Sequence, residues 1–347
     1  MNIGIIIPAY NEAERIGITL QSLLNQTYLP YQIIVVDDGS TDTTAEVVNK
    51  IATQYSVVQL VQRSEKGEHL PGAKIVQTFN YGLPYLKEAV EVICKFDADL
   101  IFPNNYLETM CQQYSENLQL GMFGGFCYIE RNGSWVLENL TNKDHLRGAV
   151  KSYRKACFEA IGGLKIAMGW DTADELLARY HGWTVQTDDT LHVKHLRPTG
   201  AGYKSNARYL QGSVFYRLRY GFFLTLLAAI KLAIRKRNGK LFLDYCKGFY
   251  KAKQEKQPYL LTPEEGKWVR QYRWKGIFSK VVKKSNNIKN ANNANNTKSM
   301  MIRGRSTTGN QTKCEPHGQI EKRRTKDEQK TNKRRTKDEQ KTNNERT

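Results

Sequence analysis

The sequence predicts an α/β fold with a mostly parallel central sheet flanked by helices. Short apolar runs typical of buried strands alternate four times with segments of helical periodicity within the first 115 residues. Such alternation is typical of parallel strands joined by crossover helices. Three of the predicted strands end in polar residues, and ligands bind at the carboxyl ends of strands in such sheets. The fold class therefore also predicts where a functional site should lie.

The predicted elements begin at the first residues of the chain. An apolar run at 3–7 is the first strand, and Asn11 is the expected N-cap of the helix that follows, with Glu14 completing a capping box. The apolar residues after Glu14 repeat with helical spacing. The further predicted elements are a strand at 32–36, a helix over 45–52 capped by Ser40 or Asp42, a strand at 57–61, a helix over about 73–87, a strand at 92–94 and a helix after Pro103.

The segment Phe96-Asp97-Ala98-Asp99 closes the fourth predicted strand. Because side chains alternate along a strand, both carboxylates should point to the same side. At about 6 Å and an effective dielectric of about 20, their repulsion is about 3 kcal/mol. A divalent cation held by carboxylate oxygens would relieve it, so the motif predicts a metal site. The alternative is a strand that ends in a polar turn, where acidic residues are common.

Charge is unevenly distributed along the chain, whose formal net charge is +19. Residues 1–199 carry 17 Lys and Arg against 23 Asp and Glu, residues 200–284 carry 20 against 4, and residues 285–347 carry 16 against 7. The basic balance suggests nucleic-acid binding as one function, but the predicted α/β part is acidic. No G-x-G-x-x-G follows the first strand and no P-loop motif occurs, which disfavours ordinary dinucleotide-binding and P-loop proteins.

Cysteine usage and hydropathy predict a cytoplasmic protein. The six cysteines are scattered without a C-x-x-C pair, which is typical of free thiols in a reducing compartment. No signal peptide is visible before the first predicted strand. The uncharged apolar stretch at 220–230 has 11 residues, whereas a helix that spans a bilayer needs about 20.

The basic segment 201–284 is expected to be helical. Between Tyr209 and Arg237, apolar residues recur at spacings of three or four and basic residues bracket them. Such an amphipathic helix can lie on an anionic membrane surface. Alternatively, it packs on the N-terminal domain with its basic face in solvent. Residues 285–347 contain an identical tandem repeat of 11 residues without an apolar side chain, so we expect a disordered tail there.

Six short motifs follow one another along the chain. They are Ile5-Ile6-Ile7-Pro8-Ala9-Tyr10-Asn11-Glu12, Val35-Val36-Asp37-Asp38-Gly39-Ser40-Thr41-Asp42, Asn80-Tyr81-Gly82, Asp97-Ala98-Asp99, Ile161-Gly162-Gly163-Leu164 and Gly169-Trp170-Asp171. Taken together, and in this order, they resemble the motifs of family 2 glycosyltransferases of the GT-A fold. The resemblance covers about residues 1–200, which would be the catalytic domain.

The resemblance implies a nucleotide-sugar donor bound at the first strand ends. An aspartate of the pair Asp37 and Asp38 would accept the imide hydrogen of a uracil-type base. Lys74 would face the nucleotide, or else it is a solvated helix residue. The donor-binding residues implied are Pro8, Ala9, Tyr10, Glu12, Asp37, Asp38, Lys74 and Asp97.

The resemblance also implies a metal ion at the Asp-x-Asp motif. Asp99 would bind Mg²⁺ or Mn²⁺, which neutralises the leaving nucleoside diphosphate, and Asp97 would lie near the ribose. Related enzymes often place a histidine near the metal or the phosphates, and His195 and His192 are both candidates. His195 next to Arg197 can face anionic oxygens, although a single histidine is more often structural.

The catalytic base is expected at the start of a helix that ends near Gly182. The family usually has Glu-Asp here, and counting back from Gly182 aligns Asp171 with the base and Trp170 with the glutamate. Asp174, three residues further on, can share a helix face with Asp171 and is the second candidate. Either acid can instead be a first-turn residue that stabilises the helix.

The resemblance implies an inverting, metal-dependent glycosyltransferase in cell-surface polysaccharide synthesis. Its acceptor would be a hydroxyl of a glycan or of a lipid-linked molecule, attacking the anomeric carbon in a single displacement. The protein would be cytoplasmic, either free or peripheral on the inner face of the plasma membrane. Two alternatives stay open: a catalytically inactive member of the family, and a basic nucleic-acid-binding protein, although no specific nucleic acid is expected.

Overall fold

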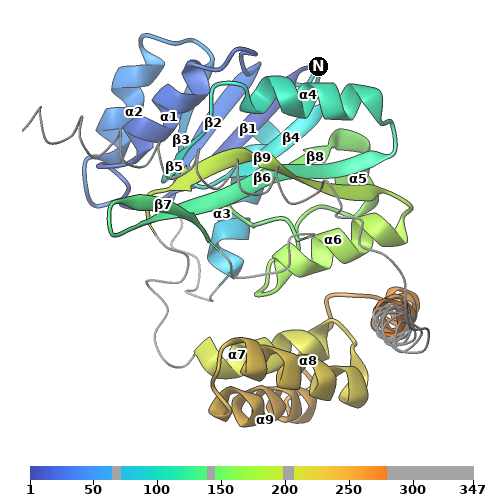
Figure 1. Ribbon diagram of the computed structural model, residues 1–347. Helices are drawn as coiled ribbons and strands as arrows, with labels where there is room; N and C mark the ends of the chain where they lie inside the picture. The colour runs from blue at the N-terminus through green and yellow to red at the C-terminus, as the bar shows by residue number, and fades with distance from the viewer. Residues whose placement is uncertain (65–71, 139–144, 198–206, 280–347) are drawn as a thin grey trace, which may run out of the picture. The chain divides into compact units, whose positions relative to one another are not determined.

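The computed structural model describes residues 1–64, 72–138, 145–197 and 207–279 (Figure 1). Residues Met1–Ser279 form one compact unit. The predicted disordered tail lies outside the described residues, as do the two ends of the predicted basic segment. The predicted boundaries at 200/201 and 284/285 stay predictions.

A nine-stranded sheet with the strand order β3-β2-β1-β4-β8-β6-β9-β5 forms the centre, and β7 pairs with β6. The predicted strands at 3–7, 32–36, 57–61 and 92–94 correspond to the first four strands of this sheet. The strands are β1 (Ile3–Ala9), β2 (Gln32–Asp37), β3 (Val58–Gln62), β4 (Val92–Phe96), β5 (Leu100–Ile101), β6 (Leu120–Arg131), β7 (Ser134–Leu137), β8 (Val150–Arg154) and β9 (Thr184–His195).

Strand direction divides the sheet into two halves. β1 pairs in parallel with β2 and β4, and β2 pairs in parallel with β3. β8 then runs antiparallel to both β4 and β6, and β5 runs antiparallel to β9. The prediction of parallel strands therefore holds for the first half, whereas the sheet as a whole is mixed.

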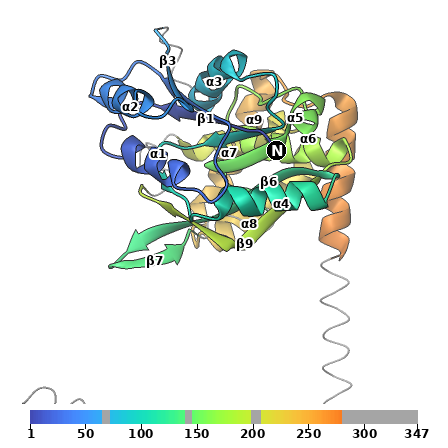
Figure 2. The same ribbon diagram turned by 90° about the horizontal axis from the view of Figure 1, so that it is seen from above.

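Helices cover both faces of the sheet, and each face has its own hydrophobic core. Consecutive side chains of β1 point in opposite directions, so Ile5 and Ile7 pack with α1 and α4 while Ile6 packs with α3. Figure 2, seen from above, has α1 and α4 in front of the sheet. These helices are α1 (Ile16–Leu24), α2 (Thr44–Ala52), α3 (Ala73–Gly82), α4 (Tyr106–Glu116), α5 (Lys155–Ala160) and α6 (Trp170–Tyr180), with a 3₁₀ turn at Leu83–Tyr85.

The first helix begins later than predicted. α1 starts at Ile16 without a capping side chain, so the predicted cap at Asn11 and its capping box with Glu14 are wrong. Asn11 has a φ of 53°, in the left-handed region that asparagine tolerates. Its side chain accepts a hydrogen bond from the backbone N–H of Thr41 at 2.8 Å. The Asn11 side chain therefore binds the loop after β2 and does not cap α1.

The basic stretch between Tyr209 and Arg237 is two helices and not one. α7 (Ala207–Arg217) ends where the N–H groups of Arg219 and Tyr220 donate back to the carbonyls of Tyr216 and Phe215. α8 (Gly221–Arg235), α9 (Lys240–Gln254) and a helix over residues 263–279 follow. Among the described residues, no helix combines the length and the apolar character that are needed to cross a membrane.

Candidate functional site

The turn between β4 and β5 and the end of β9 bring three predicted site residues together. β5 pairs with β9 so that Leu100 lies opposite His195, which places His195 next to Asp99. Asp97, Asp99 and His195 each offer one ligand atom, and these atoms all lie within 4.8 Å of one another. Asp99 and His195 are buried, and His195 Nε2 lies 3.4 Å from Asp99 Oδ1.

The chemistry of this cluster fits a divalent cation. Two carboxylates and one imidazole are suitable ligands for Mn²⁺, and carboxylates suit Mg²⁺. Glu138 contacts the other imidazole nitrogen, with Oε2 3.5 Å from His195 Nδ1, as a residue that orients a ligand would. Burial lowers the pKa of His195, but hydrogen bonds to Asp99 and Glu138 outweigh burial and raise it to about 9. The cluster as it stands therefore attracts positive charge.

Arg197 connects the ends of β1 and β4. It forms an ion pair with Glu12, and its Nε lies 3.4 Å from Asp99 Oδ2. Burial raises the pKa of Glu12, although the guanidinium of Arg197 opposes this rise. Two acids from separate strand ends thus share one arginine. Because Arg197 is about half exposed, it can also reach an anionic ligand at this edge.

The strand-end aspartates Asp37 and Asp38 have different surroundings. Asp37 accepts hydrogen bonds from the backbone N–H and the hydroxyl of Ser40, so it shapes the turn after β2. Asp38 is bound by two cations, with Arg63 Nη1 and Lys74 Nζ each 3.1 Å from its carboxylate. Lys74 Nζ also lies 4.0 Å from the centre of the Tyr10 ring, in cation–π geometry. Lys74 therefore faces the strand-end residues.

Two buried lysines lie opposite each other on β4 and β8. Lys95 and Lys151 are register partners, and both are at most 2% exposed. Their ammonium groups lie 5.5 and 5.4 Å from the ring centre of Trp170, so the electron-rich face of one ring attracts both like charges. Lys95 forms an ion pair with Asp97 and donates to the carbonyl of Gly148. This arrangement gives Trp170 a structural role as the aromatic partner of both buried lysines.

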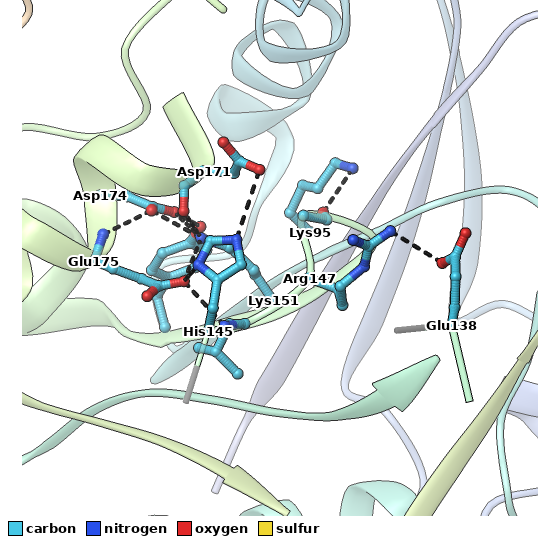
Figure 3. A network of polar contacts seen from close by, with 11 residues as sticks. Lys95, Glu138, His145, Arg147, Lys151, Asp171, Asp174 and Glu175 are labelled. Carbon is cyan, nitrogen blue, oxygen red and sulfur yellow. Dashed lines mark hydrogen bonds and ion pairs between the residues drawn. The ribbon is translucent and has the colours of Figure 1, made fainter. Parts of the chain in front are cut away.

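The two candidate bases have different environments (Figure 3). Asp174 is 1% exposed, and its carboxylate accepts hydrogen bonds from Lys151 at 2.8 and 2.9 Å and from the hydroxyl of Tyr153 at 2.6 Å. Burial raises the pKa of Asp174 while Lys151 opposes the rise. Asp171, in the first turn of α6, has a side chain that is 39% exposed. Only Asp171 of these two can therefore meet a ligand from solvent.

His145 borders Asp171 and belongs to the same polar network. Its Nδ1 lies 2.8 Å from Glu175 Oε1, and its Nε2 lies 3.9 Å from Asp171 Oδ2. Burial raises the pKa of Glu175, but the charge of Lys151 and the hydrogen bond to His145 outweigh burial and lower it. The Glu175 carboxylate therefore orients the imidazole ring beside Asp171.

Of the remaining predicted residues, Pro8 and Ala9 lie at the strand ends, whereas His192 lies outside the cluster of Asp97, Asp99 and His195. Pro8 and Ala9 lie at the end of β1, opposite Val36 and Asp37 in the β1–β2 register. His192 stacks on Tyr128 with ring centres 4.2 Å apart and contacts the carbonyl of Asp189, so it is not part of the metal-type cluster.

Several residues of the site were not predicted from the sequence. A lysine inside an apolar strand is a readable signal, and it marks Lys95 in β4. Lys151 has no such signal, because β8 reads VKSYR and is not an apolar run. The others carry no comparable signal, because non-local strand pairing and loops bring them to the site. They are Arg63, Glu138, His145 and Arg147, whose Nη2 lies 3.0 Å from Glu138 Oε2.

Comparison with known proteins identifies relatives of the N-terminal part. The family model described as glycosyl transferase family 2 matches residues 4–159. The glycosyltransferase GlyG of Streptococcus pneumoniae is 32% identical over 134 residues, which are 38% of this chain and 42% of GlyG. The poly(ribitol-phosphate) beta-glucosyltransferase of Bacillus spizizenii is 42% identical over 67 residues, 18% of this chain and 10% of that protein. The chain thus spans less than half the length of these relatives.

A solved structure has a similar fold over more of the chain. The mannosyltransferase PcManGT from Pyrobaculum calidifontis, determined with GDP-Man and Mn²⁺, superposes with a TM-score of 0.50. At 17% sequence identity, with 80% of each chain covered, the likeness concerns the fold and confirms the predicted GT-A type architecture. Residues 4–159 of this chain therefore form a glycosyl transferase family 2 domain.

Proposed function

We propose that this chain is a metal-dependent, inverting glycosyltransferase that moves a sugar from a nucleotide-sugar donor to an acceptor hydroxyl. The observation that carries the proposal is the cluster of Asp97, Asp99 and His195 at the carboxyl ends of the parallel strands. Ligands bind at this edge in open α/β sheets. The family to which residues 4–159 belong, and the nucleotide sugar bound to PcManGT, support the same donor class.

In this proposal the donor nucleotide lies along the ends of β1 and β2. The base and ribose would contact Pro8, Ala9, Tyr10 and Asp38, and Arg63 and Lys74 hold the Asp38 carboxylate in place. Mg²⁺ or Mn²⁺ held by Asp97, Asp99 and His195 would supply electrostatic stabilisation of the departing diphosphate. Arg197, released from Glu12 or Asp99, would add a second cationic group for the phosphates.

Asp171 is the proposed base. Its partly exposed carboxylate would take the proton of the acceptor hydroxyl, while His145 beside it limits how the carboxylate can turn. Attack by the hydroxyl on the face opposite the diphosphate inverts the anomeric carbon. Asp174 serves instead as the counter-ion of Lys151, because both of its oxygens already accept buried hydrogen bonds.

We further propose that the acceptor is a glycan or a lipid-linked molecule of a cell-surface polysaccharide. The names of several relatives support this class, among them the poly-beta-1,6-N-acetyl-D-glucosamine synthase of Staphylococcus epidermidis. A protein that acts on such an acceptor would work at the cytoplasmic face of a membrane, attached peripherally.

A donor screen tests the proposed function. The full chain is incubated with Mn²⁺ and a panel of UDP-, GDP- and dTDP-sugars, and the release of nucleoside diphosphate is measured. We expect one or a few donors to be turned over, and Asp99→Ala to lose that turnover. Glu46→Ala, which removes an exposed carboxylate on α2, is the matched control and should retain it. Donor binding without turnover would instead identify a catalytically inactive member of the family.

A further inference from the structure

A cavity of about 560 Å³ lies among α7, α8, α9 and the segment after α9. Its volume is within the range of small-molecule sites. Apolar and aromatic side chains from three helices form its walls, including Tyr216 of α7, Phe222 and Leu226 of α8 and Phe249 of α9. None of its lining residues belongs to the strand-end site, so the cavity is a separate feature of the molecule.

Three cations also line this cavity: Arg219, Lys253 and Arg270. Among the described residues that line it, none is acidic. None of the three is buried, so their charges lie where the cavity meets solvent. An apolar interior with an uncompensated cationic border is complementary to a molecule that has an apolar chain and an anionic head.

Arg219 is held in place by several features of the surrounding chain. Its guanidinium lies 3.6 Å from the centre of the Tyr259 ring, and its Nε donates to the carbonyl of Leu261 at 2.7 Å. Its φ of 55° is in the left-handed region, which costs a non-glycine residue energy. Gly266 leaves room for the side chain, because a Cβ there would lie 2.5 Å from Arg219 Cδ. Arginine is thus accommodated at a helix end where glycine is usual.

A row of exposed apolar side chains on α8 begins at the cavity. Phe222 lines the cavity and is 63% exposed, and Phe223 and Ile234 are each 71% exposed. Leu227 and Ile230 continue the row at helical spacing. Contiguous exposed apolar surface of this kind is typical of binding faces, including those that enter a lipid surface.

We propose that the α7–α9 group binds an anionic lipid, with one apolar chain in the cavity and a phosphate-bearing head group against Arg219, Lys253 and Arg270. The apolar row of α8 lies in the surface of the same bilayer. Residues 285–347 suit the site poorly as an occupant, because they carry 16 basic against 7 acidic residues and so have the same sign as the site. Lipid binding is independent of the proposed sugar transfer, so either can fail while the other holds.

Titration calorimetry of the full chain with soluble alkyl phosphates tests the cavity directly. Each buried methylene should tighten binding roughly fourfold, so octyl phosphate should bind roughly 15-fold tighter than hexyl phosphate. Inorganic phosphate and neutral octyl glucoside should each bind at least about tenfold more weakly than octyl phosphate. If inorganic phosphate binds as tightly as octyl phosphate, the site recognises only the anion. If octyl glucoside binds as tightly as octyl phosphate, the cations do not contribute. Either result overturns the proposal.

A pair of variants tests whether the alkyl chain binds in the cavity or on the neighbouring surface of α8. Leu226→Trp fills the cavity and should abolish octyl phosphate binding, whereas Leu227→Trp on the neighbouring exposed position should retain it. Thermal unfolding checks that both variants are folded, and release of nucleoside diphosphate should be unchanged in both. Equal loss or equal retention of octyl phosphate binding by the folded pair would overturn the proposed position of the chain.

Exposed charge variants provide a second test that does not depend on the packing of the cavity. Lys253→Glu and Lys247→Glu change the net charge equally, but only Lys253 lines the cavity. We expect Lys253→Glu to weaken co-sedimentation with phosphatidylglycerol-containing vesicles more than Lys247→Glu does. Equal effects would assign binding to net charge alone. The α8 row would instead be a dimer interface if the full chain self-associates, Phe223→Asp abolishes that self-association and the chain does not bind vesicles. Equal effects of the two lysine variants and such a dimer each contradict the proposal.

Discussion

Exchanging Asp174 for asparagine should destabilise the protein, whereas the same exchange at Asp171 should stop sugar transfer. The two acids are three residues apart on α6, and sequence alone left both as candidates for the base. Their burial differs sharply, since the Asp174 side chain is 1% exposed and that of Asp171 is 39% exposed. The pair of variants therefore separates a structural carboxylate from a reactive one.

The size of each effect follows from the contacts. Removing one partner of a buried ion pair costs about 3–5 kcal/mol. Asp174→Asn belongs at the lower end, about 3 kcal/mol, because Lys151 still has Glu175 Oε1 3.4 Å away. The Asp171 carboxylate has one titratable neighbour at 3.9 Å and considerable exposure, so its loss should cost about 0–1 kcal/mol of stability. Loss of a general base lowers the turnover number by about 10²–10⁴-fold.

Thermal unfolding and donor turnover are measured on the same preparations. Asp174→Asn should lower the unfolding temperature by about 6–12 °C and keep turnover where it is folded. Asp171→Asn should unfold like the unmodified chain, bind donor and fail to transfer. A stable but inactive Asp174→Asn together with a fully active Asp171→Asn would refute the reasoning and make Asp174 the base.

Three further outcomes are expected. Gly248→Ala should destabilise the protein by about 1–3 kcal/mol in urea unfolding, because its Cβ would lie 1.9 Å from the carbonyl oxygen of Tyr209 and push α7 and α9 apart; Gly239→Ala, with no atom within 4 Å, should have little effect. Trp170→Leu should cost about 2–4 kcal/mol in the same assay, because it removes the ring that contacts both buried lysines, and unchanged stability would contradict that role. EDTA should stop release of nucleoside diphosphate and Mn²⁺ should restore it; turnover that persists in EDTA would disprove a metal held by Asp97, Asp99 and His195.

Local sequence patterns were sufficient for the first half of the sheet. The apolar runs at Ile3–Ala9 and Gln32–Asp37 are buried on both faces, which is why they read as continuous apolar segments. The polar residues after them lie at one edge, as the alternation of strands and helices predicted. The second half, which is mixed, was not predictable in this way, because β8, β6 and β9 pair across large sequence separations that no local pattern records.

Capping and helix continuity were less predictable, because they depend on competing contacts. Asn11 has the right residue type for an N-cap, but the loop after β2 takes its side chain. The spacing between Tyr209 and Arg237 fits a single helix, yet the backbone turns at Arg219 and its side chain packs on Tyr259 instead. In both cases a tertiary contact outweighs a local preference of about 1 kcal/mol.

The sequence by itself determined the class of fold and the strand ends at which the acids gather, because both follow from the period of apolar residues along the chain. Only the tertiary structure decided the surroundings of each residue of the site. It placed His195 against Asp99 through the β5–β9 pairing, and it buried Asp174 against Lys151 while leaving Asp171 exposed. Burial and charge partners set the chemistry of a carboxylate, and both are properties of neighbours in space that the order of residues does not contain.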